Sequence, residues 1–174
     1  MGRGILDELV VAFPNFADGH IARAEAARQA GELEAAAAAY RSALKLEPFH
    51  QRASNDLAWL LGEQLDKPHE ALEIADKAAA RYPNDPHLLD TRGAILMRLG
   101  RWTDARRDLE RCLELAKAIP STQAHAAIRL ARVLLRQNDV EGAKARLAEA
   151  REIDTKNRVL SDRQRTEIDQ LLGS

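Results

Sequence analysis

The chain has 174 residues, of which 30% are charged, 45% are hydrophobic and only 4% are aromatic. Its formal net charge is −1, yet residues 1–85 hold 9 Lys/Arg and 14 Asp/Glu while residues 86–174 hold 17 and 13, so the first half is acidic and the second basic. A nucleic-acid-binding solenoid would carry a continuous basic stripe, and this polarity therefore argues against nucleic acid as a partner. No segment reaches the roughly 18 to 20 apolar residues of a membrane span, so we expect no membrane insertion.

The first 16 residues have the pattern of half a helix pair. Apolar residues precede Pro14 as a helix precedes its closing proline: Ile5, Leu6, Leu9, Val10, Val11 and Phe13. Asp7 and Glu8 interrupt this stretch and no small-residue cleavage site follows it, which is not typical of a signal peptide. Two interpretations stay open. The helix caps the unit that follows, or residues 4–13 mediate self-association or stacking within a larger solenoid.

A spacing of small residues then recurs four times. In each unit a small residue is followed about twelve positions later by an alanine, and seven positions after that by another small residue. The first residues are Ala24, Ala58, Gly93 and Ala131, the alanines are Ala36, Ala71, Ala105 and Ala143, and the last residues are Ala43, Ala78, Cys112 and Ala150. Successive units are offset by 34, 35 and 38 residues. These offsets are typical of repeats built from paired helices.

Turn residues accompany this spacing: Gly31 and Pro48 in the first unit, Gly100 and Trp102 in the third. With them the chain resembles the tetratricopeptide repeat family. The resemblance implies an all-α fold, a right-handed α-solenoid of about four helix pairs with flanking N- and C-terminal helices. Because no Gly/Ser-rich linker interrupts the chain, we expect a single domain. Its predicted parts are an N-terminal helix or half repeat (1–16), repeats 1 to 4 (17–50, 51–85, 86–120 and 121–157) and a C-terminal capping helix (158–174).

Two departures from the repeat predict local irregularity. The interval from Ala58 to Ala71 is one residue longer than its counterparts, and its turn carries Pro68 in place of glycine, so we expect a looser turn with Pro68 in the first turn of the next helix. Around Pro120 the chain has four extra residues. Four residues make about one helical turn, so one or both helices there are predicted to be a turn longer.

The C-terminal segment has the pattern of a capping helix over about 161–172. Ser161 and Gln164 form a capping-box pair, and the apolar Ile168, Leu171 and Leu172 lie on one stripe among charged residues. A terminal repeat has no neighbour to cover its apolar face, so we expect this helix to cover repeat 4.

Candidate binding residues follow from the resemblance, which implies that the first helix of each repeat lines a concave groove for a peptide or helix. The predicted groove residues are Asn55, Trp59, Asp90, Arg98, Arg129, Arg132 and Arg136. Trp59 is the candidate apolar anchor, the four arginines are candidate contacts for an acidic segment near repeat 4, and Asn55 and Asp90 are candidate contacts to a peptide backbone. Alternatively, Trp59 packs between helices, and the arginines of repeat 4 pair locally with Asp139 or Glu141.

Catalytic chemistry has little support in the sequence. The five histidines are scattered over the repeats. One arrangement is of interest for a metal ion, that of His87, Asp90 and His125. The commoner explanation of such histidines is that they are surface residues at the starts of helices. The single cysteine, Cys112, occupies an alanine position of the repeat and is predicted to be a buried core residue; Trp102 is assigned to packing between helices. We expect no enzyme activity, no cofactor and no metal.

The sequence therefore favours a non-catalytic adaptor that binds a peptide or helix in the groove. The alternative is a structural element that assembles into a larger solenoid or homo-oligomer through the N-terminal helix. This alternative predicts dimers that form with increasing concentration through Ile5, Leu9 and Phe13. A cytoplasmic location is the default, and a domain excised from a larger exported protein would have the same composition.

Overall fold

The computed structural model describes residues 11–173 of the chain, and every regular element within that range is helical. These residues form two compact units, which divide between Tyr82 and Pro83. The predicted N-terminal helix residues Ile5, Leu6, Leu9 and Val10 lie outside the described residues.

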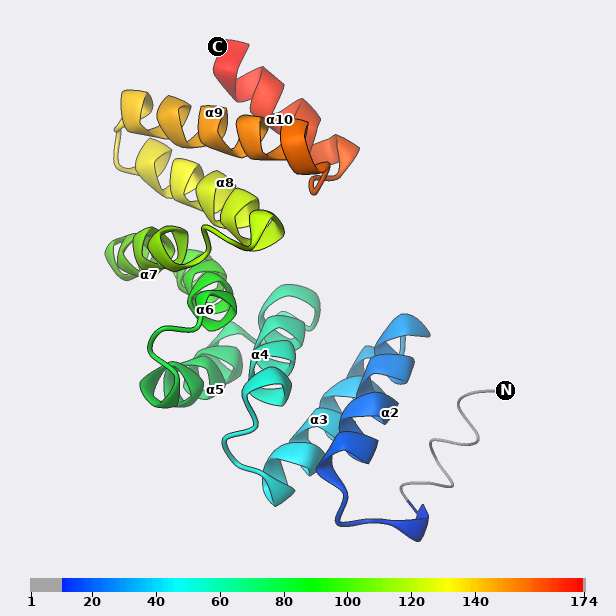
Figure 1. Ribbon diagram of the computed structural model, residues 1–174. Helices are drawn as coiled ribbons and strands as arrows, with labels where there is room; N and C mark the ends of the chain where they lie inside the picture. Colours follow the sequence, from blue (N-terminus) through cyan, green and yellow to red (C-terminus); the bar gives the residue numbers. More distant parts are fainter. Residues whose placement is uncertain (1–10, 174) are drawn as a thin grey trace. The chain divides into compact units, whose positions relative to one another are not determined.

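The first unit consists of two helix pairs in chain order (Figure 1). Its elements are α2 (Ala17–Gln29), α3 (Leu33–Leu46), α4 (Gln51–Trp59), a π-helical segment (Leu60–Gln64) and α5 (Pro68–Arg81). α2 packs on α3, α3 on α4, and α4 on α5. Ala24, Ala36, Ala58 and Ala71 of the repeated spacing are all fully buried, because only a small side chain lets two helices approach closely.

The extra residue of repeat 2 lies in the π-helical segment. The Leu65 amide donates to the Leu60 carbonyl at 3.0 Å, five residues earlier, which is the bond of a π turn. Asp66 then takes a left-handed conformation with φ of 53°, where Gly31 has φ of 78° in the first repeat. Pro68 opens α5, as predicted.

The second unit contains two helix pairs and a last single helix. These are α6 (Pro86–Arg98), α7 (Trp102–Leu115), α8 (Pro120–Arg136), α9 (Val140–Asn157) and α10 (Asp162–Gly173). α6 packs on α7, α7 on α8, α8 on α9, and α10 on α9; α6 also contacts α8. α8 has 17 residues against 13 in α6, which confirms the prediction of an additional turn after Pro120.

The predicted capping box begins α10. The Ser161 amide donates to Gln164 Oε1 at 3.0 Å, and the Gln164 amide donates to Ser161 Oγ at 3.4 Å. Ile168 is buried, so the apolar stripe of α10 covers α9 as expected.

Cys112 is a core residue, as predicted. Its side chain is fully buried, and its Sγ donates to the Pro86 carbonyl at 3.2 Å. Burial raises the pKa of the Cys112 thiol to about 12, so the thiolate that a nucleophile requires is not formed at neutral pH.

Candidate functional site

The arginine side of α8 brings together four of the seven predicted groove residues: Asp90, Arg129, Arg132 and Arg136. Arg129, Arg132 and Arg136 lie three and four residues apart, a spacing that aligns side chains along one side of a helix. Each has a partner on a different helix.

Arg129 joins α8 to α6 through Asp90. Its Nη1 donates to both carboxylate oxygens of Asp90 at 2.7 Å, and the two side chains are only 20% and 15% exposed. A charge-assisted pair with this little exposure holds its geometry better than a surface pair does. The two hydrogen bonds use one nitrogen of a group that carries five N–H donors.

Arg132 joins α8 to α10 through Glu167. Nε donates to Oε1 at 2.7 Å and Nη2 donates to Oε2 at 2.6 Å, a bidentate arrangement. The hydrogen bonds from Arg132 lower the pKa of Glu167, so the pair is charged at neutral pH. Asp139, one of the two local partners considered for these arginines with Glu141, instead accepts a hydrogen bond from the Gly142 amide at 2.9 Å and caps α9.

Arg136 lies at the end of α8 and contacts an aromatic ring. Its guanidinium carbon is 5.2 Å from the ring centre of Trp102, the first residue of α7, which is a cation–π distance. Arg98, exposed at the end of α6, occupies the position of the previous repeat that corresponds to Arg136.

The remaining two predicted residues, Asn55 and Trp59, lie on α4 in the first unit. Asn55 Nδ2 donates to Asp56 Oδ1 at 3.3 Å, and Trp59 is half-buried in the last turn before the π-helical segment. Arg52 forms ion pairs with Glu25 of α2 and with Asp56. Carboxylates therefore dominate this side of the first unit, in keeping with its acidic composition.

Two of the three residues considered for a metal have other contacts. His87 Nδ1 lies 3.1 Å from Thr122 Oγ1, and Asp90 binds Arg129. Burial, followed by the charge of Arg129, lowers the pKa of His125, so His125 is neutral at pH 7. Within residues 11–173 no group of three His, Cys, Asp or Glu side chains is placed to hold a metal ion.

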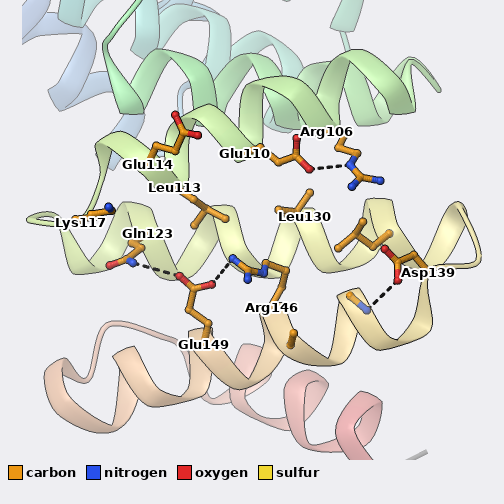
Figure 2. A pocket seen from close by; sticks show the side chains of 13 residues that line it. Arg106, Glu110, Leu113, Glu114, Lys117, Gln123, Leu130, Asp139, Arg146 and Glu149 are labelled. Atoms are coloured by element: carbon orange, nitrogen blue, oxygen red, sulfur yellow. Dashed lines mark hydrogen bonds and ion pairs between the residues drawn. The ribbon is translucent and has the colours of Figure 1, made fainter.

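A groove in the second unit was not predicted from the sequence. It lies between α7 and α9, has α8 as its floor and encloses about 540 Å³ (Figure 2). Its α9 wall includes the small residues Gly142 and Ala145. Alanines are so frequent in this chain that such positions could not have been singled out from the sequence.

The described helices include none with the length and apolar character that a membrane crossing requires.

Comparison with known proteins identifies the repeats. Two family models described as tetratricopeptide repeat match residues 5–86 and 87–156. A TPR repeat-containing protein of Pseudomonas aeruginosa, PA4667, is 35% identical over 74 residues, which are 42% of this chain. The chain spans only 12% of that relative's length.

Solved structures with the same fold cover most of the chain. PilW, a widely conserved type IV pilus biogenesis factor, is 22% identical and aligns with a TM-score of 0.77 over 97% of this chain and 76% of its own. PilF of Pseudomonas aeruginosa is 22% identical, with a TM-score of 0.76 over 90% and 68% of the two chains. MamA of Desulfovibrio magneticus RS-1 is 18% identical, with a TM-score of 0.75 over 87% and 83%. At these identities the likeness establishes the fold alone, and it confirms the predicted all-α solenoid class.

Proposed function

The chain belongs to the tetratricopeptide repeat family, and from that premise we propose that it is a non-catalytic protein-binding module whose arginine side of α8 takes an acidic segment of a partner protein. The observation that carries this proposal is the fixed position of Arg129, Arg132 and Arg136, each held by a contact to another helix.

The charge balance of this surface supports an anionic ligand. The three arginines of α8 are accompanied by two carboxylates, those of Asp90 and Glu167. The surface is therefore cationic, and Arg129 and Arg132 retain N–H donors beyond those used in their ion pairs. Because these contacts already restrict the arginine side chains, these side chains lose less conformational entropy when a partner binds.

In the first unit, Trp59 and Asn55 are our candidates for further contacts. A half-buried tryptophan offers an apolar surface of the kind that dominates interface energetics. The Asn55 amide supplies a donor and an acceptor, which suits the backbone of an extended peptide. The carboxylates around them would favour a partner segment that is less acidic.

The test is the binding of a fluorescein-labelled Glu-rich peptide, followed by anisotropy at low and physiological ionic strength. We expect the double variant Arg132→Glu, Arg136→Glu to weaken binding by about tenfold or more, because two favourable charges are reversed. The matched control is Arg107→Glu on α7, where the arginine is 76% exposed. If Arg107→Glu lowers the affinity by the same factor, the effect depends on net charge alone, and this result would contradict the proposed surface.

A second candidate function, self-association, is favoured by the exposed apolar residues before α2. Val11 is 81% exposed and Phe13 is 60% exposed, in a chain whose core is otherwise well buried. Under this alternative, sedimentation should detect dimers that increase with concentration and that Phe13→Asp dissociates. Val140→Asp, at another exposed valine, serves as the control. Dimers that persist in Phe13→Asp would exclude this part of the chain as the interface.

A further inference from the structure

The groove between α7 and α9 lies on the opposite side of α8 from the arginines. Leu130 and Leu134 line its floor one helical turn apart, and Arg132 is two residues from each, about half a turn around the helix. We propose that this groove is a second protein-binding surface, and that it takes an amphipathic helix with aliphatic residues on one side and charges of both signs on its flanks.

The floor provides the apolar contact. Leu113 of α7 joins Leu130 and Leu134 there, and all three are largely buried, with their edges forming the bottom of the groove. Ala145 on the α9 wall is exposed, and its small side chain leaves room beside the leucines. Aliphatic side chains of a partner would bury against this floor, each contributing roughly 1.5 to 3 kcal/mol when fully enclosed.

The walls determine the charge of the partner. On α7, Arg106 Nε donates to Glu110 Oε1 at 2.7 Å; on α9, Arg146 Nη1 lies 2.7 Å from Glu149 Oε2 (Figure 2). Each wall is thus close to neutral and presents both signs along its length. A partner with flanks of one sign would meet repulsion as often as attraction, whereas flanks with alternating signs can add to both pairs.

The form of the partner follows from the same walls. The backbone groups of α7, α8 and α9 along the groove are bonded within their own helices, so the groove offers no free backbone edge to pair with an extended peptide. A helix satisfies its own backbone hydrogen bonds and needs only a side-chain surface. The α7 wall runs from Arg106 to Glu114, about 12 Å of helix, which matches roughly two turns of a partner helix.

The experiment uses three synthetic helical peptides that share leucines along one side and are constrained by the same side-chain link on the outer side. Their flanks carry alternating Glu and Lys, only Glu, or only Lys, and binding to the full chain is measured by anisotropy. We expect the alternating peptide to bind most tightly, and Ala145→Glu and Ala145→Tyr each to weaken it by at least about tenfold. The matched control is Ala38→Glu, at the corresponding exposed position of repeat 1 on α3.

Three outcomes would overturn the proposal. Equal affinity for all three peptides, or binding unchanged by both Ala145 variants, would mean that the groove does not select such a helix. If the wild-type chain forms dimers and Ala145→Glu dissociates them, the occupant of the groove is a second copy of the chain. The variant Arg132→Glu, Arg136→Glu should still bind the alternating peptide, so this test and the acidic-peptide test can fail independently.

Discussion

Arg165 of α10 donates from Nε to Asp154 Oδ2 of α9 at 2.7 Å and from Nη2 to Asp154 Oδ1 at 3.3 Å. Asp154 Oδ1 also accepts from the Leu160 amide at 2.8 Å, within the turn that leads into α10. One carboxylate therefore holds both the capping helix and the turn before it. This contact joins the end of the repeat array to the helix that covers it.

Loss of the Arg165 side chain should release α10 while the rest of the second unit stays folded. Arg165→Met keeps the length and apolar part of the side chain but removes the donors to Asp154, so the α10 amides should exchange severalfold faster with deuterated solvent. Hydrogen exchange resolved by mass spectrometry measures this directly. Arg163→Met, on the exposed side of α10, is the control. Exchange that rises equally in both variants would contradict a specific role of the Arg165 contact.

Acid should also release α10. The hydrogen bonds from Arg165 lower the pKa of Asp154, and those from Arg132 lower the pKa of Glu167. Because both folded pKa values lie below the unfolded values of about 4, the stabilisation is complete only above about pH 5 and is lost as the pH falls through the unfolded and then the folded values. We expect α10 amide exchange, corrected for its intrinsic pH dependence, to accelerate below about pH 4. In the variant Asp154→Asn, Glu167→Gln the exchange rate of α10 should depend less on pH. If its dependence on pH is the same as in the wild-type chain, other groups cause the effect.

Local patterns in the sequence were enough to predict much of this fold. The spacing of small residues located the helix pairs, and Ser161 and Gln164 located the start of α10, because both depend on neighbours within a few turns. The partners of the arginines depend instead on how separate helices pack. Arg132 meets Glu167, 35 residues away, and sequence spacing alone offered only Asp139 and Glu141. The groove over α8 was missed for the same reason.

Gly93 is the small residue of repeat 3, where the other repeats have alanine. A Cβ at Gly93 would lie 2.9 Å from both Cγ and Cδ2 of Leu109, a fully buried side chain. Gly93→Ala should therefore destabilise the protein by about 1 to 3 kcal/mol in urea unfolding, because Leu109 has little room to move. In a Leu109→Ala background the same substitution should cost much less, because the clash is gone. Additive effects of the two substitutions would contradict the clash.

The π-helical segment predicts which single-residue deletion the chain tolerates. A π turn contains one residue more than the α-helical turn it replaces, and this extra residue is the one that lengthens repeat 2. Deletion of Gly62 should let α4 continue as an α-helix and keep the register of α5, with a change in Tm below about 5 °C. Deletion of Ala94 in α6, which has no extra residue, should rotate the rest of that helix by about 100° and move the buried Ile95 and Leu96 out of the core. Thermal unfolding followed by circular dichroism compares the two, and equal destabilisation would show that the π turn does not carry the insertion.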